Sequence, residues 1–153
     1  MPPGQVPDVL RKKKIIKNTC MQISASILNT GSQNEVTVST NSATKQLLIP
    51  PKSEGNGSSI NGGELLFLAL ATCFCNDIYR EAKKRQMHIT SVKVVVSGEF
   101  GDEGKPGFNI QYDAKVDGDA TDEEINDLIS YVDQIAEVHN TLRFGTTVTL
   151  KGT

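Results

Sequence analysis

Hydrophobic side chains are most concentrated in the middle of the chain, over residues 65–75, where Thr72 is the one polar side chain. A helix that is apolar on every side has to be buried on every side. Just upstream, Asn61 and Glu64 have the spacing of a capping box, in which each side chain bonds the other's backbone N–H. Downstream the stretch becomes polar and basic, which suits the negative end of a helix dipole. The pattern predicts one long central helix over residues 61–87.

Such a helix would be about 40 Å long. This length exceeds the radius of a compact domain of this size, so the apolar half has to lie inside something larger than one subunit. We therefore expect an obligate homodimer, with the long helix buried at its centre.

Alternation of apolar and polar residues predicts β-strands on both sides of this helix. Before the helix, residues 15–28, 35–40 and 44–49 show the pattern of a three-stranded meander. After the helix, residues 91–100 and 108–116 show the pattern of a hairpin closed by a glycine-rich loop.

A second helix is predicted after this hairpin, because Thr121 and Glu124 have the spacing of another capping box. Apolar residues follow on one face at helical spacing: Ile125, Leu128, Ile129, Val132, Ile135 and Ala136. We expect this helix to end near Asn140 and a last short strand to cover residues 146–150. The expected order is βββ-α-ββ-α-β, and because hairpins outnumber crossovers, the predicted fold class is α+β with antiparallel sheets.

Length and composition favour a single domain over residues 1–153, with residues 1–14 as a flexible N-terminal segment. The formal net charge of −2 favours neither nucleic acid nor an anionic membrane as a partner. We see no secretory signal and no apolar run long enough to span a membrane. The expected location is the cytoplasm, where the three cysteines would be reduced.

Motifs for nucleotides, cofactors and metals are missing from the sequence. The two histidines, His88 and His139, are too few for a histidine metal site, and no CxxC pair is present. We therefore expect neither a metal nor a cofactor.

Two of the three cysteines, Cys73 and Cys75, lie in the predicted central helix. Residues two apart on a helix point about 200° away from each other, so these thiols cannot form a disulfide within the helix. Cys73 shares its face with Asp77 and Arg80, whereas Cys75 shares its face with Tyr79. A free cysteine is often a buried packing residue, and for either thiol taken alone this is the favoured interpretation.

The order and spacing of four segments resemble the OsmC/Ohr family. The stretch NGGELLFLALATC is similar to the start of that family's central helix, and SVKVVVSGEF, VDGDATDEEINDLI and VHNTLRFGTTV fall where the family has corresponding segments. The resemblance covers nearly the whole chain, and the order of the segments carries it rather than any single motif. It implies the OsmC-like fold, an intertwined α+β homodimer with the long helices buried at its centre.

The resemblance also implies a chemistry centred on Cys73. In the family, the cysteine at this position attacks the terminal oxygen of an organic hydroperoxide and becomes a sulfenic acid. A second cysteine near the end of the second helix then forms a disulfide with it, while a Glu and an Arg support the thiolate. The implied activity is that of a thiol-dependent peroxidase in oxidative-stress defence, working without a cofactor.

The chain departs from the family pattern at the supporting residues. Ala136 stands where the second cysteine is expected, and Gly63 stands where the supporting Glu is expected. The neighbouring Glu64 matches a variant of the pattern, so Cys73 and Glu64 are the predicted catalytic residues.

No arginine lies between residue 11 and Arg80, so Arg80 is the candidate replacement for the supporting Arg. Asp77 lies one helical turn from Cys73. A carboxylate at that distance is expected to raise the pKa of the thiol and to make it a poorer nucleophile.

Two functions therefore stay open. The first is a peroxidase for organic hydroperoxides, in which Cys73 is oxidised and then reduced by Cys75, Cys20 or an external thiol, although helix geometry argues against Cys75. The second is a non-catalytic dimer that binds a small apolar ligand, peroxidase activity having been lost with the missing residues. The retained Cys73 favours the first function, and the departures from the pattern favour the second. A purely structural role has less support, since a dimer alone requires no cysteine there.

Overall fold

The computed structural model describes residues 20–152, and the chain divides into two compact units. The first unit comprises residues 1–59 and the second comprises residues 60–153, and each is described by itself. The segment expected to be flexible, residues 1–14, lies outside the described residues.

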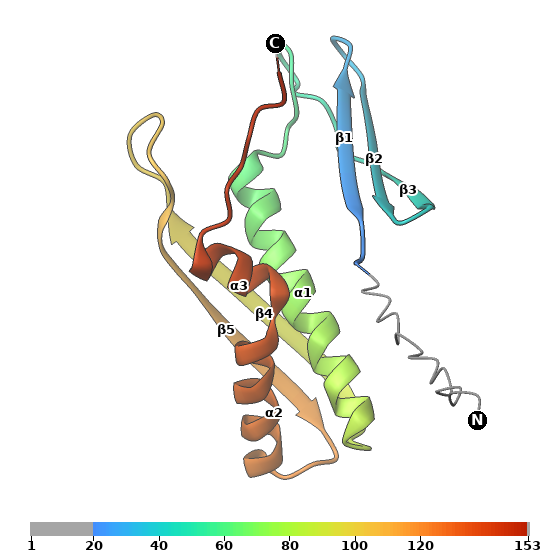
Figure 1. Ribbon diagram of the computed structural model, residues 1–153, viewed down its shortest axis with the longest axis vertical. Coiled ribbons are helices and arrows are strands. Elements are labelled where there is room, and N and C mark those ends of the chain that lie inside the picture. The colour runs from blue at the N-terminus through green and yellow to red at the C-terminus, as the bar shows by residue number, and fades with distance from the viewer. Residues whose placement is uncertain (1–19, 153) are drawn as a thin grey trace, which may run out of the picture. The chain divides into compact units, whose positions relative to one another are not determined.

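The first unit contains an antiparallel meander of three strands, β1 (Ile23–Asn29), β2 (Asn34–Thr40) and β3 (Ala43–Leu47), as Figure 1 shows. The predicted three-stranded meander is therefore confirmed, but its first strand begins at Ile23: residues 20–22 are not in a strand, and residues 15–19 of the predicted strand lie outside the described residues. Ile27 pairs with Val36, and Val36 pairs with Leu47, so apolar side chains share one face of this sheet. Ile27 and Leu47 nevertheless stay exposed, at 54% and 47%.

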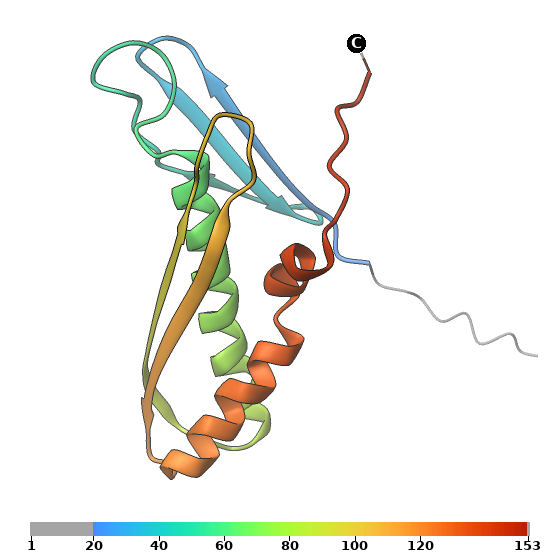
Figure 2. The same ribbon diagram turned by 90° about the vertical axis from the view of Figure 1, so that its left-hand side faces the viewer.

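The second unit begins with the central helix α1 (Gly62–Lys84), as predicted from the apolar stretch. It continues with β4 (Ile89–Glu99) and β5 (Phe108–Gly118), which form the predicted hairpin as a two-stranded antiparallel ribbon. Helix α2 (Asp122–Ile135) follows, and α1 and α2 pack against the same face of the ribbon (Figure 2).

The core of the second unit lies between this ribbon and the two helices. The register of the ribbon places Val92 opposite Val116 and Val94 opposite Ala114, and all four side chains point toward the helices. Its largest fully buried side chains come from α1 and α2: Phe74, Ile78, Leu128 and Val132. The core thus surrounds the C-terminal half of α1, and its N-terminal half is less covered.

The structure corrects the prediction of one continuous second helix ending near Asn140. The chain is extended at Ala136, with φ −64° and ψ 107°, and a separate helix α3 (Glu137–Phe144) begins directly after it. A continuous helix would bond the N–H of Val138 to the carbonyl of Gln134, four residues earlier. The side-chain amide of Asn140 donates to that carbonyl instead, at 2.9 Å. The break is therefore compensated locally, and it leaves the N–H of Val138 available for another acceptor.

The predicted last strand, residues 146–150, is also wrong for this structure, because the chain after Gly145 has no regular secondary structure. Val148 and Leu150 are 95% and 85% exposed. A strand needs a neighbour to take up its backbone hydrogen bonds, and none of the described strands pairs with this segment. The order of elements in residues 20–152 is therefore β1-β2-β3-α1-β4-β5-α2-α3.

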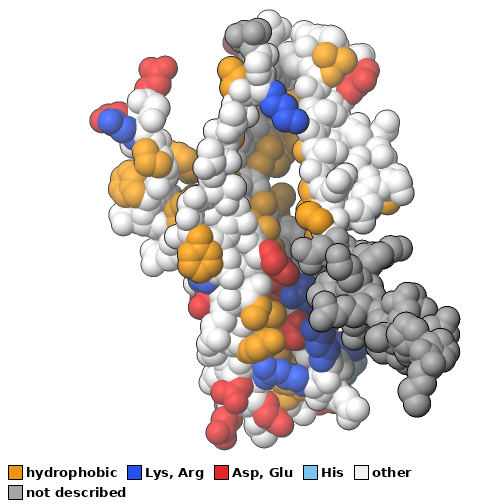
Figure 3. All heavy atoms as spheres, viewed as in Figure 1, with side chains coloured by type: hydrophobic (Ala, Val, Ile, Leu, Met, Phe, Trp, Pro, Cys, Tyr) orange, Lys and Arg blue, Asp and Glu red, His pale blue; other side chains and the backbone are white. Residues whose placement is uncertain are grey.

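Apolar surface remains uncovered on the second unit. The first turns of α1 leave Leu65 and Leu68 exposed, at 37% and 60%, so burial on every side is not reached within one unit. Figure 3 also shows hydrophobic side chains at the surface near the loop between β4 and β5, where Phe100 and Phe108 are exposed. Across residues 20–152, we find no helix that has both the length and the apolar character to span a membrane.

Candidate thiol site

Cys73 lies in the middle of α1 and is partly buried. Its thiol donates a hydrogen bond to Oδ2 of Asp77, with 3.7 Å between sulfur and oxygen. The two residues are four apart, so the helix places them one above the other on the same face, as the sequence predicted. Asp77 itself is only 3% exposed.

The beginning of α3 contributes a second partner to this thiol. The backbone N–H of Val138, which has no partner within α3 after the break at Ala136, lies close enough to the sulfur of Cys73 to lower the pKa of the thiol. A backbone N–H at the start of a helix carries a partial positive charge and favours a negatively charged acceptor. This contact was missed at the sequence level, because a continuous helix would have used the same N–H internally.

Arg80 lies beside the carboxylates of the site. Its guanidinium contacts Oδ1 of Asp77 through Nη1 at 2.7 Å and Oε1 of Glu81 through Nε at 3.0 Å. A longer contact of 3.9 Å joins its Nη2 to Oε1 of Glu137, the first residue of α3. Arg80 therefore influences the thiol of Cys73 indirectly, because it pairs with the carboxylate that accepts the hydrogen bond of the thiol.

These surroundings raise the pKa of Cys73 above its ordinary value. The largest cause is burial, and the negative charges of Asp77 and Glu137 act in the same direction, while the N–H of Val138 opposes them. The pKa of Asp77 is also raised, by burial first and then by Glu137, against the opposing charge of Arg80. The thiol is thus mostly protonated at neutral pH, and a proton acceptor lies directly beside it.

Glu64, the other predicted catalytic residue, forms the predicted capping box at the start of α1. Its carboxylate accepts from the N–H of Asn61 at 2.7 Å, and its own N–H donates to Oδ1 of Asn61 at 2.9 Å. Nine positions of helix separate it from Cys73, about 13 Å along the axis. Within one subunit the structure does not bring Glu64 and Cys73 together.

Gly63, where the family pattern has its supporting Glu, has no room for a side chain. A Cβ atom added there would lie 2.9 Å from the ring of Phe100 and 3.2 Å from Oδ1 of Asn61. Any larger residue would have to displace Phe100, so the glycine suits this packing.

The other two cysteines do not pair with Cys73 in this structure. Cys20, Cys73 and Cys75 are all free thiols, and Cys20 is exposed. Cys73 and Cys75 both lie within α1, and the expectation that they cannot form a disulfide there stays a prediction.

Cys73, Asp77 and Glu137 offer ligand atoms that lie within 4.8 Å of one another, which is close enough to hold a metal ion. Arg80, however, already contacts both carboxylates with its guanidinium. A divalent cation would have to displace this positive charge, so the arrangement is that of an ion-pair network around a thiol. The sequence-based expectation of no metal stays a prediction.

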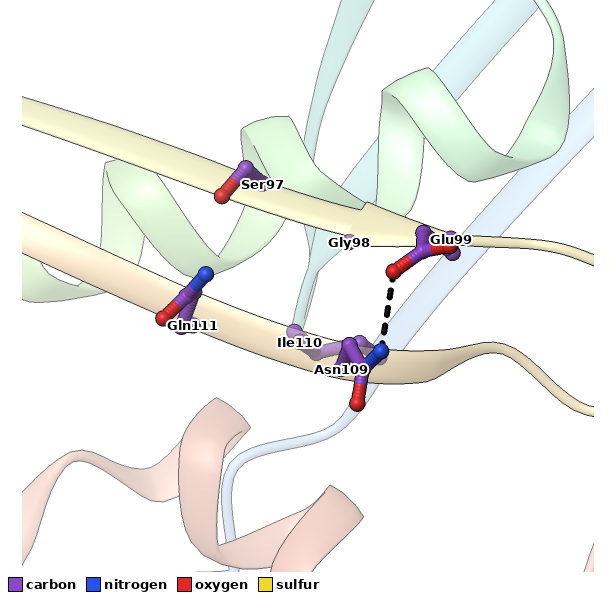
Figure 4. A pocket seen from close by; sticks show the side chains of 6 residues that line it. All are labelled: Ser97, Gly98, Glu99, Asn109, Ile110 and Gln111. Atoms are coloured by element: carbon purple, nitrogen blue, oxygen red, sulfur yellow. Dashed lines mark hydrogen bonds between the residues drawn. The ribbon is translucent and has the colours of Figure 1, made fainter.

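Three hollows of the second unit are lined in part by β5. The largest, about 570 Å³, lies between β5 and α2. The next, about 400 Å³, runs between the ends of β4 and β5, where the side-chain amide of Asn109 donates to Glu99 at 2.8 Å (Figure 4). Its lining residues include neither a thiol nor an imidazole, as Figure 4 shows. The smallest, about 230 Å³, includes His139, which sequence reasoning missed as a site residue. In the sequence, the burial of His139 was indicated by the apolar stripe, which continues from Val132 and Ala136 to position 139.

Residues 55–151 match the sequence model of one protein family, described as OsmC-like protein. The chain matches no curated protein sequence.

Several solved structures share the fold, among them three OsmC-like proteins. An OsmC-like protein from Mycoplasma pneumoniae is 19% identical with a TM-score of 0.57, and the match covers 82% of this chain and 89% of that one. An OsmC-like protein from Vibrio cholerae O1 biovar eltor is 13% identical with a TM-score of 0.52, covering 77% and 92%. An OsmC-like hydroperoxide resistance protein from Jannaschia sp. CCS1 is 15% identical with a TM-score of 0.50, covering 87% and 95%. At these identities the likeness shows the fold alone.

Replacing the carboxylate beside the thiol should speed its alkylation. Asp77→Asn removes a negative charge next to Cys73, so the pKa of the thiol should fall and the thiolate fraction at neutral pH should rise. We expect iodoacetamide to react with Cys73 several-fold faster, measured peptide by peptide by mass spectrometry. Glu81→Gln is the matched control, since it removes another buried carboxylate of α1 and should leave the rate unchanged. An unchanged or slower reaction in Asp77→Asn would contradict this electrostatic account.

Glu64→Gln should leave both the thermal midpoint and the alkylation rate of Cys73 close to wild type, because glutamine also closes a capping box. Asn61→Ala, which removes the cap itself, should lower the free energy of unfolding by about 1 kcal/mol. Thermal melts and labelling rates are measured on the same samples. Slower labelling in Glu64→Gln at unchanged stability would instead place this carboxylate at the thiol, as the sequence hypothesis requires.

Proposed function

The chain belongs to the OsmC-like protein family, and from this premise we propose that it is a thiol-dependent peroxidase in which Cys73 reduces organic hydroperoxides. The observation that carries the proposal is the pair of contacts on the sulfur of Cys73. A buried carboxylate that can take its proton lies on one side, and a backbone N–H that can stabilise negative charge lies on the other. The hydroperoxide resistance named for the Jannaschia protein suggests the substrate class.

In the proposed first step, the thiol proton of Cys73 moves to Asp77, and the thiolate attacks the terminal oxygen of the hydroperoxide. An S–O bond forms, the O–O bond breaks, and the alkoxide leaves with the proton that Asp77 returns to it. The sulfur is oxidised to a sulfenic acid, and the hydroperoxide is reduced to an alcohol. Arg80 holds the carboxylate of Asp77 in place for both proton transfers.

The second step needs a reductant from outside the chain, because Ala136 has no sulfur with which to form a disulfide. A small thiol attacks the sulfenic acid, releases water and leaves a mixed disulfide on Cys73. A second thiol then reduces that disulfide and restores the free cysteine. This chemistry belongs in a compartment that keeps thiols reduced, as expected from the cysteine content. A role of Glu64 at the thiol stays a prediction.

The alternative function is a dimer that binds a small apolar ligand without redox chemistry. The observation that favours it is the environment of Cys73, where burial and two carboxylates raise the pKa of the thiol. A poorly ionised thiol without a second cysteine reacts slowly with peroxide. The activity measurement below decides between the two functions.

We expect the protein to form a homodimer at low micromolar concentration. Each subunit leaves apolar side chains of α1 and of the first sheet uncovered, among them Leu68 at 60% and Ile23 at 68% exposed. Burial of such residues contributes about 25 cal/mol per Å² of apolar surface, which drives association. Size-exclusion chromatography with light scattering measures the mass. A folded monomer as the main species would remove the dimer from the proposal.

With a dithiol reductant, the purified protein should consume cumene hydroperoxide faster than hydrogen peroxide, because apolar residues such as Leu70 and Phe74 flank the thiol in α1. Cys73→Ser should abolish turnover, and Cys75→Ser should largely preserve it. Asp77→Asn should lower turnover by about 10²-fold, the usual contribution of a positioned acid–base group, although it speeds alkylation. Slower turnover together with faster alkylation would show that Asp77 transfers a proton, because a change in thiol ionisation alone would move both rates in the same direction.

The oxidised protein provides a second readout. Treated with hydroperoxide and no reductant, it should gain oxygen on Cys73 by intact mass, and no internal disulfide. Wild-type consumption no faster than that of Cys73→Ser would remove the enzyme function and leave ligand binding. A loss of two hydrogens per chain would show that Cys20 or Cys75 reaches Cys73.

A further inference from the structure

The cavity that includes His139 lies between α1, β5 and α3 of the second unit and has a volume of about 230 Å³. Its lining consists of three aliphatic side chains and three polar or aromatic ones: Leu70, Ile110, Leu142, Tyr112, His139 and Arg143. A small, mostly apolar cavity with a few converging polar groups is the usual form of a small-molecule site.

His139 is the unusual member of this lining. The residue is only 4% exposed, and neither ring nitrogen has a hydrogen-bond partner among the described residues. Its ring instead packs edge-on against Tyr112, at 4.7 Å between centroids, and against Phe74 at 5.7 Å. Buried polar groups are normally hydrogen-bonded, so an unpaired imidazole at a cavity indicates a partner that binds there.

Arg143 places a guanidinium, ion-paired with Asp133, at the cavity. Its Nη1 donates to the backbone carbonyl of Asp133 at 2.7 Å and to Oδ1 of Asn140 at 3.2 Å, and its Nη2 bonds the carboxylate of Asp133. The hydroxyl of Tyr112 donates to the same carboxylate. These contacts hold the guanidinium in position while its side chain stays 41% exposed. A cavity whose polar groups are mainly N–H donors suits a ligand that brings acceptors.

We propose that this cavity binds a small apolar monocarboxylate, whose carboxylate contacts His139 and Arg143 while its hydrocarbon part lies along Leu70, Ile110 and Leu142. The charge of Arg143 selects an anion over a neutral analogue, and the imidazole supplies the hydrogen bond that it lacks in the free protein. The volume limits the ligand to about the size of one substituted ring. Binding at this cavity does not depend on the peroxidase chemistry of Cys73.

Binding should also couple to protonation of His139. Burial and the charge of Arg143 lower the pKa of this imidazole, against a smaller opposing effect of Asp133, so the free protein holds it neutral at neutral pH. The remaining titratable group that faces it is Tyr112, whose pKa burial and Asp133 raise to about 12, so the phenol stays neutral too. A bound carboxylate favours the imidazolium and raises the pKa of His139. The affinity should therefore increase as the pH falls from about 8 to about 6.

The test uses benzoate as the probe and the full chain as the protein. The sequence has only two histidines, so an imidazole nitrogen–proton correlation spectrum resolves His139 beside His88 as an internal reference. We expect benzoate to shift the His139 signals in a saturable manner and to leave His88 unchanged. Benzyl alcohol, which has the same ring without the charge, should bind at least about tenfold more weakly. The same titration on Cys73→Ser should give the wild-type affinity, which separates this proposal from the peroxidase.

Variants provide the second arm of the test. His139→Phe keeps an aromatic ring against Tyr112 and Phe74 and should weaken benzoate binding about tenfold or more, measured by calorimetry. His88→Phe is the matched control, because His88 is exposed and should bind benzoate like the wild type. Undisturbed His139 signals at saturating benzoate in the wild-type spectrum would overturn the proposal, whatever the variants do. Equal affinities for benzoate and benzyl alcohol, or wild-type affinity in folded His139→Phe, would overturn it as well.

Discussion

The thiol site depends on one displaced backbone hydrogen bond. A continuous helix would pair the N–H of Val138 with the carbonyl of Gln134. The extended conformation of Ala136 separates these two groups: the carbonyl accepts from the side chain of Asn140, and the N–H lies close enough to the sulfur of Cys73 to lower the pKa of the thiol. Buried backbone groups left unpaired are costly, so the bond from Asn140 helps to stabilise the break. The electrostatics of Cys73 thus depend on where the second helix is interrupted.

A second constraint is the carboxylate of Asp77, one of two buried carboxylates of α1 and only 3% exposed. Burying a charge is costly unless it is paired, and Arg80 and the thiol of Cys73 supply the pairing. The same pairing limits the ionisation of the thiol, because a carboxylate that accepts the hydrogen bond of the S–H group also disfavours the thiolate. The site therefore keeps its cysteine protonated at rest and holds the base that can remove the proton within contact distance. Such an arrangement suits a reaction in which a proton must leave the sulfur and then reach a departing alkoxide.

The parts of the fold and site that could be predicted from the sequence are those determined by neighbouring residues. The capping boxes that start at Asn61 and Thr121 and the shared face of Cys73 and Asp77 follow from helical spacing. The hairpin strands follow from alternation, and their limits differ from the prediction by only a few residues. The break before α3 could not be predicted, since no glycine or proline marks it and its compensation comes from side chains that a helix pattern leaves free. The burial of His139 could have been predicted, because position 139 continues the apolar stripe of Val132 and Ala136 at helical spacing.

The cavity and the thiol are connected through the first turn of α3. Val138, whose N–H lies close to the sulfur of Cys73, directly precedes His139, which lines the cavity. A ligand that shifts the backbone of this turn would also move the N–H of Val138 relative to the sulfur, and thermodynamic linkage would make that coupling reciprocal. A ligand that enters without shifting the turn leaves the thiol unaffected, and equal benzoate affinities of the wild type and Cys73→Ser would identify this second case. The break at Ala136 thus places the residue beside the thiol and the residue that lines the cavity next to each other at the start of one short helix.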